Sequence, residues 1–407
     1  MKVLVFNCGS SSLKFELVEL DASGRNRNRR CARGIFQEIG PRAKTVMTDR
    51  DGKSVEASSP APDHASAALR AIEWLNSTVG EPVPDAIAHR IVHGGEHVIE
   101  PTLVNEAVIR NLEEASRFAP LHNPPALATI RAVSQKFAGL PAVVVADTAF
   151  HQTLPEYARA YAIPRDLAKR HGIRRFGFHG LGHAWMMERY AEIRGLPAEG
   201  LKLITLQLGA GCSATAINMG KSIDTSMGLT PLEGLMMATR SGDIDPAIFS
   251  YLAASEGLTP AQVEYILYHQ SGFLGVSGLS SDMRELEAAA HANENAALAI
   301  EMFCYRVRKY LGAYFAALGG ADAIIFGGGI GEHSANVRAG VCSGLERLGV
   351  MLDSGRNREA TGREARISAD GSPVEIHVIP LDEELYMARA AAILLSNREP
   401  RNANRSD

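Results

Sequence analysis

The sequence predicts an α/β protein whose two halves follow one plan, and three segments support this prediction. Residues 3–20 place a small polar turn between two runs of strand-forming residues, a pattern typical of strand, turn and strand. Residues 203–218 repeat this pattern half a chain later. Residues 323–348 give a strand, a glycine-rich loop and an amphipathic stretch. Because two openings of the same kind indicate two similar halves, we expect a duplicated α/β core.

The first half begins with a buried strand and its neighbour. Val3–Phe6 predicts a strand, Asn7–Ser12 a turn and Leu13–Leu20 a second strand. The basic stretch Arg25–Arg33 predicts a solvated loop, because neighbouring like charges favour solvent. The elements expected further along are a helix at His64–Asn76, a short strand from Ala86 and a strand at Ala142–Ala146.

The second half contains a loop suited to an anion. Ala323–Phe326 predicts a strand, Gly327–Glu332 a loop and Ser334–Leu348 an amphipathic helix. This order offers backbone N–H groups and a helix dipole to a negative charge. The remaining predictions are strands at Leu203–Leu208, Ala214–Asn218 and Val374–Pro380, an Ala-rich helix ending near Ser396, and a frayed polar tail from Glu399.

The composition is that of an ordinary folded protein. The chain has 407 residues, 46% of them hydrophobic and 22% charged, which excludes a disordered chain and a small disulfide-stapled scaffold. Its net charge of −4 argues against nucleic acid or a membrane as a partner. Five scattered cysteines without a CxxC pair indicate reduced thiols. Because no apolar run has the length of a signal peptide or a membrane span, we expect a cytoplasmic protein.

Three patterns look like ligand motifs but lack the required context. Gly220–Ser222 matches the end of a P-loop, yet Thr215 stands where the first glycine belongs. Gly209–Ala214 loosely matches a dinucleotide fingerprint, but a strand follows it instead of a helix. His89 and His93 are spaced like metal ligands on a helix, but the glycine pair after them breaks a helix.

Charged residues stand beside small or rigid ones in several segments. Taken singly, each is more typical of a turn or a helix cap than of a site. Together they supply arginines for charge, glycine loops for phosphates, and carboxylates for Mg²⁺ or for positioning a proton. The sequence therefore indicates a site for a phosphoryl group in the segments 89–96, 119–124, 147–151, 174–180 and 224–246.

At this point the chain resembles the acetate kinase family from residue 1 to about residue 395, in the order typical of that family. The longest shared motif begins DTSMGLTPLEG and ends TRSGDIDP, and it is also the most specific. The other shared strings are VFNCGSSSLKF, HRIVHGGE, APLHNPPAL, DTAFHQTLP, RRFGFHGLGH, GVSGLSSDMRE, GGGIGEH and IPLDEELYMAR.

The resemblance implies a fold, an assembly and a reaction. It implies the actin-like ATPase superfamily, with two duplicated ribonuclease H-like domains, an active-site cleft between them and a homodimer. The expected domains are 1–148 plus 384–407, and 149–383, the second carrying the nucleotide site and the dimer interface. The implied reaction is the reversible transfer of the γ-phosphoryl group of ATP to acetate, giving acetyl phosphate and ADP, with Mg²⁺ or, in its place, Mn²⁺.

The resemblance also assigns roles to individual residues. Arg90 would hold the acetate carboxylate. Asp147 would orient the substrate rather than deprotonate it, because acetate is already ionised at neutral pH. His179 and Arg240 would stabilise charge on the transferring phosphoryl group. The implied metal residues are Asn7 and Glu383. The implied nucleotide residues are Ser10, Ser12, Lys14, Gln207, Leu208, Gly209, Ala210, Gly211, Asp282, Met283, Arg284, Gly328, Gly329, Ile330, Gly331 and Glu332.

The implied acyl pocket is lined by Val92, Leu121, Phe178 and Pro231, which are apolar and suit a methyl group. One methylene changes discrimination by only ~1–3 kcal/mol. We therefore expect acetate to be the preferred substrate and propionate a slower one.

The chain departs from the usual family pattern on the nucleotide side. In the family motif H-L-G-N-G, this chain has Gln207 in place of the histidine and Ala210 in place of the asparagine. In the motif H-G-T-S-H, it has Leu181 and Gly182 in place of the threonine and the serine. His333 replaces an asparagine. Three hypotheses therefore compete. The first is an ATP-dependent acetate kinase, the second an acyl kinase that uses pyrophosphate or another NTP or prefers propionate. The third is a non-catalytic nucleotide-binding protein, which the retained charged residues disfavour.

Cys8 and Cys212, one in each phosphate loop, support a smaller hypothesis. If both line the cleft, Mg-nucleotide should slow their reaction with a thiol reagent. The alternative is that both are small residues in tight turns.

Overall fold

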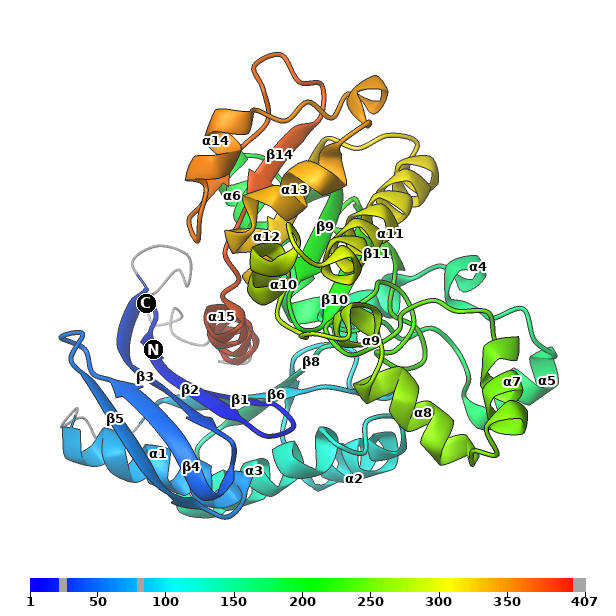
Figure 1. Ribbon diagram of the computed structural model, residues 1–407. Coiled ribbons are helices and arrows are strands. Elements are labelled where there is room, and N and C mark those ends of the chain that lie inside the picture. Colours follow the sequence, from blue (N-terminus) through cyan, green and yellow to red (C-terminus); the bar gives the residue numbers. More distant parts are fainter. Residues whose placement is uncertain (22–27, 79–83, 398–407) are drawn as a thin grey trace. The chain divides into compact units, whose positions relative to one another are not determined.

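The structure is a computed structural model that describes residues 1–21, 28–78 and 84–397 (Figure 1). These residues form two units. Unit 1 comprises Met1–Phe150 and the segment that begins at Asp382, and unit 2 comprises His151–Leu381.

The described residues of unit 1 form a mixed sheet of eight strands. Its central pairs are β1 antiparallel to β2, and β1, β6 and β8 parallel to one another in that order. Across the sheet the strands are β5 (Ser54–Ala61), β4 (Gly40–Thr48), β3 (Arg29–Gln37), β2 (Leu13–Glu19), β1 (Lys2–Cys8), β6 (Ala86–Ile91), β8 (Ala142–Ala146) and β7 (Thr102–Leu103).

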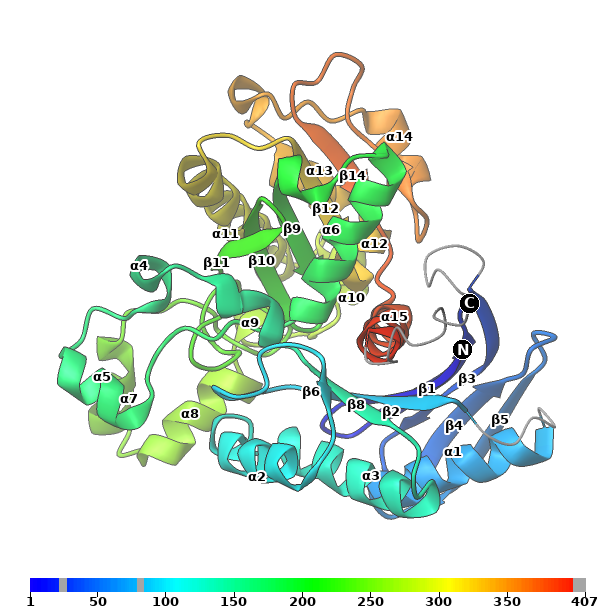
Figure 2. The ribbon, with the colours of Figure 1, turned by 180° about the vertical axis from the view of Figure 1, so that it is seen from behind.

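Helices cover both faces of this sheet. The helices α1 (His64–Thr78), α2 (Glu106–Ala115) and α3 (Asn123–Lys136) lie on one face, and α15 (Glu383–Ser396) lies on the other (Figures 1 and 2). Because side chains alternate along a strand, β1 has side chains on both faces of the sheet. Leu4, Phe6 and Cys8 belong to the buried core with α1 and α3, while Asn7 contacts α15.

Unit 2 contains a six-stranded sheet with the same central plan. Across it the strands are β11 (Lys221–Thr225), β10 (Cys212–Asn218), β9 (Lys202–Leu208), β12 (Ala323–Gly327), β14 (Glu375–Val378) and β13 (Ala365–Arg366). Three antiparallel strands, β11-β10-β9, continue into two parallel ones, β12-β14, as β3-β2-β1 continue into β6-β8. The predicted duplicated α/β core is therefore confirmed.

The sheet of unit 2 lies between α6 (Gly180–Arg194), which contacts β9 and β12, and the long α11 (Glu294–Leu318), which contacts β10 (Figures 1 and 2). The other helices of unit 2 are α4 (Glu156–Arg159), α5 (Arg165–His171), α7 (Ala247–Ser255), α8 (Pro260–His269), α9 (Gly272–Ser277), α10 (Met283–Ala289), α12 (Gly328–His333), α13 (Ala335–Cys342) and α14 (Ser354–Glu359). Among the described residues, no helix combines the length and the apolar character that a membrane span requires.

Two element predictions were wrong in part. The stretch Arg25–Arg33 was predicted as a solvated loop, but β3 begins at Arg29. Arg29 and Arg30 are exposed on this strand, and Arg30 also pairs with Glu16 and Asp382. Residues 25–27 lie outside the described part. The helix predicted from Ser334 to Leu348 is shorter and preceded by another. Helix α12 begins at Gly328, and α13 ends at Cys342. The tail from Glu399 lies outside the described residues.

Candidate functional site

Three polar residues of unit 1 lie together where its parallel strands end. Asn7 is near the end of β1, Arg90 near the end of β6, and Asp147 directly follows β8. The carboxyl ends of parallel strands meet at one edge of a sheet. The register pairs Phe6 with His89 and Ile91 with Ala146, so the three side chains share the face that α15 covers.

Arg90 joins this group through its planar guanidinium. Its Nε and Nη2 donate to the two oxygens of Asp147 at 2.9 and 2.6 Å, and its Nη1 donates to Asn7 Oδ1 at 3.0 Å. Asp147 is 1% exposed. Burial acts to lower the pKa of Arg90, but attraction to Asp147 outweighs it and the pKa rises above its ordinary value. Arg90 therefore remains a fixed cation, and both oxygens of Asp147 are engaged in holding it.

The first residues of α15 bring carboxylates to the same group. Asn7 Nδ2 donates to Glu383 Oε2 at 3.2 Å and to Glu384 Oε1 at 2.9 Å. Lys14 Nζ lies 4.0 Å from Glu384 Oε1. Carboxylate and amide oxygens are the protein ligands that Mg²⁺ prefers. Glu383 and, beside it, Glu384, which was not predicted, offer carboxylate oxygens that fit the predicted metal site. The amide oxygen of Asn7, the other predicted ligand, accepts from Arg90 Nη1 in this structure.

An ion-pair network beside this group was also missed. Arg30 on β3 places Nε 2.6 Å from Glu16 Oε1 and Nη2 2.5 Å from Asp382 Oδ2. Asp382 in turn caps α15 by accepting from the Leu385 N–H at 3.1 Å. Glu16, Asp382 and Glu384 could offer ligand atoms to one ion. Arg30 instead compensates Glu16 and Asp382 and so fixes the start of α15.

The turn between β1 and β2 is held by its own backbone. Gly9 N donates to Ser12 O at 2.8 Å, and His64 Nε2 hydrogen-bonds to Gly9 O at 2.9 Å. A Cβ at Gly9 would lie 2.7 Å from Ser12 Oγ. Ser10 is exposed and Ser12 half-buried, so the hydroxyls expected at the nucleotide sit on a fixed turn.

A buried asparagine links the two segments of unit 1 that were predicted to contact the acyl group. Asn123 accepts from His93 N at 3.1 Å and donates to His93 O at 2.9 Å. This brings the segment after Val92 to the segment after Leu121. Val92 is buried, whereas Leu121 is 60% exposed.

In unit 2, His179 has an uncommon backbone conformation. It precedes α6 with φ 60° and ψ 23°. A residue other than glycine pays ~1–3 kcal/mol there and persists only where its surroundings hold it. Its Nδ1 lies 2.9 Å from Ser213 Oγ. A Cβ at Gly211 would lie 3.3 Å from its Nε2 and 3.7 Å from Arg240 Nη1, so the predicted residues His179, Gly211 and Arg240 meet.

Arg240 lacks an ion-pair partner among the described residues. Its Nη1 donates to Pro231 O at 3.1 Å. Burial lowers its pKa, and an arginine stays charged in proteins all the same. A half-buried cation without a counter-ion favours an anion beside it.

The loop that carries Pro231 is held by a network the sequence analysis did not find. Arg175 Nη1 donates to the carbonyls of residues 225, 226 and 227 at 3.0 to 3.2 Å. Its Nη2 pairs with Glu233 at 2.5 Å, and Tyr161 also donates to Glu233. Phe178, predicted beside Pro231 in the acyl pocket, is buried, and its carbonyl hydrogen-bonds to His151 Nε2 at 3.0 Å.

The loop after β9 is open at its tip. Gln207 and Leu208 are buried, Gly209 and Gly211 half-buried and Ala210 exposed. Gln207 lies beside Gly182, where a Cβ would come within 1.9 Å of Gln207 Oε1. The two departures from the family pattern are therefore in contact, and this glycine makes room for this glutamine.

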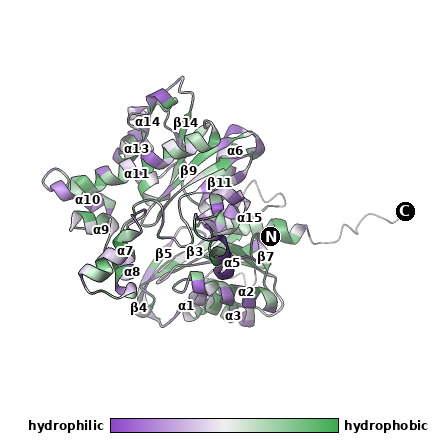
Figure 3. Cartoon of the chain, turned by 90° about the vertical axis from the view of Figure 1, so that its right-hand side faces the viewer, coloured by the Kyte–Doolittle hydropathy of each residue, from purple (hydrophilic) through white to green (hydrophobic). Residues whose placement is uncertain are grey.

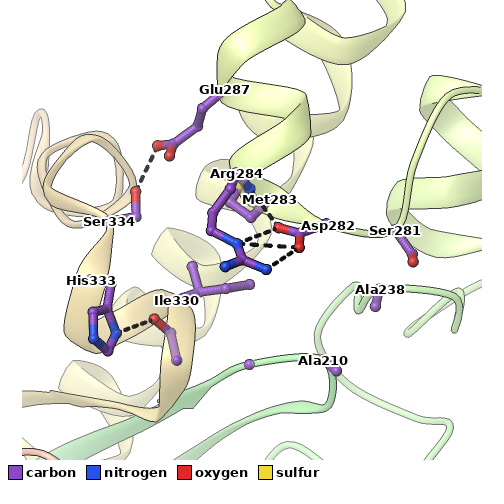
Figure 4. Close-up of a pocket in the computed structure, with 12 residues that line it drawn as sticks. Ala210, Ala238, Ser281, Asp282, Met283, Arg284, Glu287, Ile330, His333 and Ser334 are labelled. Atoms are coloured by element: carbon purple, nitrogen blue, oxygen red, sulfur yellow. Dashed lines mark hydrogen bonds and ion pairs between the residues drawn. The ribbon is translucent and has the colours of Figure 1, made fainter. Parts of the chain in front are cut away.

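A pocket of about 540 Å³ opens next to this loop (Figure 4). Its walls include Ala210, Asp282, Met283, Arg284, Gly329 and Ile330 of the predicted nucleotide set. Ala238, Ser281, Glu287, His333 and Ser334 were not predicted. Ser334 donates to Glu287 at 2.6 Å, and His333 Nδ1 hydrogen-bonds to Gly329 O at 3.0 Å (Figure 4). The volume lies in the range of small-molecule sites.

Glu332 was predicted at the nucleotide, but its side chain is used elsewhere. Its Oε1 accepts from the N–H groups of Gly328 at 2.9 Å and Leu381 at 3.1 Å. Buried Arg338 donates to Gly331 O at 2.8 Å. Both residues hold α12 in place, and neither is among the residues that line the pocket.

Comparisons with known proteins identify the family of this chain. A family model described as the acetokinase family matches residues 2–389. An acetate kinase of Solibacter usitatus is 46% identical over 401 residues, covering 96% of this chain and 97% of the relative.

Solved structures are similar as well. A Porphyromonas gingivalis acetate kinase is 41% identical with a TM-score of 0.90, covering 97% of this chain and 99% of the other. A Francisella tularensis propionate kinase is 39% identical with a TM-score of 0.88, covering 96% of this chain and 98% of the other. The chain therefore belongs to the acetokinase family.

Proposed function

We propose that this protein is an acetate kinase, which transfers the γ-phosphoryl group of ATP to acetate, reversibly and with Mg²⁺. One observation carries the proposal. Unit 1 holds a buried Arg90–Asp147 pair beside the carboxylates of α15, and unit 2 holds a glycine loop flanked by His179 and Arg240. Phosphoryl transfer depends mainly on positioning and on charge stabilisation, which these groups supply.

Unit 1 supplies the groups for the acyl substrate. Arg90 has five N–H groups, of which three are engaged with Asp147 and Asn7 at 3.0 Å or less. One N–H on Nη2 is left, and the second N–H of Nη1 makes only a long hydrogen bond of 3.5 Å to Cys8 O. These two donors suit a carboxylate. Asp147 fixes the guanidinium with both oxygens, which favours a positioning role over proton abstraction.

The metal belongs with unit 1 in this proposal. Asn7 and Glu383, with Glu384 beside them, would hold Mg²⁺. The ion would supply positive charge to the phosphate oxygens of the nucleotide. Arg30 and Asp382 hold these carboxylates at the start of α15.

Unit 2 supplies the nucleotide groups. The pocket between Asp282–Arg284 and Gly329–Ile330 has the volume for a nucleoside, and it adjoins the phosphate loop at Gly209 and Ala210. Backbone N–H groups of such a loop can hold phosphate oxygens. His179 and Arg240, next to Gly211, would stabilise the charge on the transferring group.

The experiment is a hydroxamate trap with Mg²⁺ and hydroxylamine. Acetate and propionate are each supplied with ATP, GTP or pyrophosphate. We expect acetyl hydroxamate with ATP, a slower reaction with propionate, and a loss on the order of 10³ in rate for Arg240→Ala. Arg363→Ala, an exposed arginine 3.8 Å from Glu359, serves as the matched control and should keep full activity.

Other outcomes contradict the proposal in separate ways. Product only with pyrophosphate or another NTP would mean that Gln207 and Ala210 mark a changed donor. A higher specificity constant for propionate would change the acyl substrate. No product with any donor, from folded protein, would leave a binding protein.

The assembly in this proposal is a cytoplasmic homodimer. Helix α7 contains seven apolar residues in nine, and none of them is buried in one chain; it shows hydrophobic colouring in Figure 3. Tyr251 is 71% exposed. Exposed apolar surface of this kind marks an interaction site. Light scattering should give twice 43.7 kDa, and Tyr251→Glu should shift the protein toward the monomer. A monomeric wild-type protein would contradict this assembly.

A further inference from the structure

Beneath α6, two histidines and two hydroxyls form a continuous chain of hydrogen bonds. Thr205 Oγ1 lies 2.7 Å from His183 Nδ1, His183 Nε2 lies 2.7 Å from Ser213 Oγ, and Ser213 Oγ lies 2.9 Å from His179 Nδ1. Thr205, His183 and Ser213 are completely buried. The chain therefore runs from the interior of the sheet to the residue that faces Gly211 and Arg240.

The sequence positions explain why these groups meet. Thr205 on β9 and Ser213 on β10 have their side chains on the same face of the sheet, the face that α6 covers. Thr205 pairs with Thr215, which is two residues after Ser213 on the same strand, and residues two apart on a strand share a face. His179 directly precedes α6, and His183 N in the first turn of that helix donates to His179 O at 3.1 Å, which keeps the two histidines close together. The first turn of α6 therefore lies over the neighbouring strands β9 and β10.

Proton counting gives this chain a direction. Ser213 has one hydroxyl proton, so one of its two ring partners must accept and the other must donate. Thr205 Oγ1 has His183 as its single side-chain partner among the described residues. A buried hydroxyl proton without an acceptor is costly. Thr205 therefore donates to His183 Nδ1. Burial holds the pKa of His183 well below its ordinary value, so His183 is neutral and its one proton is on Nε2.

We infer that Thr205, His183 and Ser213 are positioning residues that fix His179 as the tautomer protonated on Nε2. His183 Nε2 donates to Ser213 Oγ, and the Ser213 hydroxyl donates to His179 Nδ1. The proton of neutral His179 then lies on Nε2, the nitrogen nearest to Gly211. In this way a neutral imidazole presents an N–H donor beside Arg240. The role of that donor, to bind an oxygen of the transferring phosphoryl group, rests on the proposed function.

The direct test is the protonation pattern of His179 in the wild-type protein. The full chain is labelled with ¹⁵N-histidine, and long-range ¹H–¹⁵N spectra are recorded at alkaline pH, where an ordinary imidazole is neutral. The signal is assigned by its loss in His179→Gln. We expect the proton on Nε2. A proton on Nδ1 would overturn the inference, whether or not the protein phosphorylates acetate.

A kinetic comparison tests the positioning role. In Ser213→Ala the link to His179 is lost, so we expect kcat to fall about 10- to 100-fold, as for other orienting partners, with little change in the KM for ATP or acetate. The matched control is Thr215→Val, which removes a buried hydroxyl that bonds to Thr225 Oγ1 at 2.9 Å, two residues further along the same strand.

Thr215→Val should keep the wild-type kcat and the wild-type protonation pattern of His179. Equal losses in the two variants, or an unchanged His179 tautomer in Ser213→Ala, would contradict the positioning role. If the wild-type protein formed no acetyl phosphate at all, the proposed function would fail, and the spectra would still decide the direction of the chain.

Discussion

Asn7 in unit 1 and Gln207 in unit 2 occupy the same place in the repeated sheet, one residue before the end of the first core strand. Their surroundings differ. Asn7 lies among Arg90, Glu383 and Glu384, so its neighbours carry charge. Gln207 lies opposite Gly327 and beside Gly182, two neighbours that lack side chains.

The difference shows how one topology serves two purposes. Unit 1 fills its strand ends with charged side chains that hold one another, which suits a small carboxylate and a metal ion. Unit 2 has glycines near its strand ends, so backbone N–H groups there can approach a larger anion. Unit 1 should therefore be sensitive to the loss of charge, and unit 2 to the addition of atoms.

The largest expected effect is for Arg90→Ala, which tests the charged site. It leaves buried Asp147 without its partner, so we expect kcat/KM for acetate to fall on the order of 10³ or more. The free energy of unfolding should fall by ~3–5 kcal/mol, as for a broken buried ion pair. Steady-state kinetics and urea unfolding measure the two effects.

The matched control is Arg131→Ala in the same unit. Arg131 pairs with Glu113 at the surface and its side chain is 49% exposed, so its loss should cost less than ~1 kcal/mol. An Arg90→Ala enzyme within tenfold of wild type would mean that charge at the strand ends of unit 1 is dispensable.

The second prediction adds atoms to the site in unit 2. In Gly182→Ser the new Cβ would meet Gln207 Oε1, so we expect overpacking to cost ~1–3 kcal/mol of stability and the KM for ATP to rise. Adding Gln207→Ser to Gly182→Ser should restore most of the stability, because the clash is removed. Thermal unfolding of Gly182→Ser, of Gln207→Ser alone and of the double variant measures the coupling between the two positions.

Gly312→Ala on α11 is the control for this prediction. Apart from the backbone of its own helix and its chain neighbours, a Cβ at Gly312 would meet no atom within 4 Å, and alanine favours a helix by up to about 1 kcal/mol over glycine. It should be neutral or stabilising. Equal behaviour of the two glycine variants would remove the contrast between the units.

A smaller effect concerns acid stability. His89 in unit 1 is buried, stacks on Phe6, and its Nε2 has no hydrogen-bond partner among the described residues. Burial lowers the pKa of His89 to about 3 and that of His151 in unit 2 to about 4. In the unfolded chain both histidines bind a proton near pH 6.5, whereas in the folded protein they stay neutral. The folded state is therefore fully stable with respect to these two groups above pH 6.5, and its free energy of unfolding falls as the pH drops toward 4.

His89→Phe keeps the stack and removes the titration. Urea unfolding between pH 7.5 and pH 4.5 should therefore show a shallower loss of stability than in wild type. A loss as steep as in wild type would mean that His89 is not a source of acid sensitivity in unit 1.

The smallest effect sharpens the comparison of the two turns. Cys8 and Cys212 are 2% and 0% exposed. Burial raises their thiol pKa values to about 11 and about 12, respectively. Both thiols should react slowly with an aromatic disulfide at pH 7.5, and more slowly still with Mg-nucleotide. Fast reaction of the native protein would contradict the interpretation of both cysteines as small residues in tight turns. Equal rates with and without Mg-nucleotide would contradict the interpretation that they line the cleft.

Much of the fold could be predicted because its signals are local. The two hairpins, the helix at His64 and the helix after Asp382 appear in apolar periodicity and turn residues. The strands β3, β4 and β5 escaped prediction, because Arg29, Arg30 and Arg33 hide the apolar alternation of the first of them. Arg30 pairs with Glu16 and with Asp382, the latter 352 residues away, and no local pattern predicts such a contact.

The sequence by itself determined the repeated α/β plan and the set of chemistry-bearing residues, since short motifs record both. Tertiary structure alone decided which of those side chains hold one another. Asn123, Arg175 and Glu332 bind backbone groups far away in the chain, and Thr205 reaches His179 through two other residues. Hydrogen-bond partners depend on distances between strands and helices that no local pattern specifies, so orientation, protonation and the room at Gly182 appear only when the chain is folded.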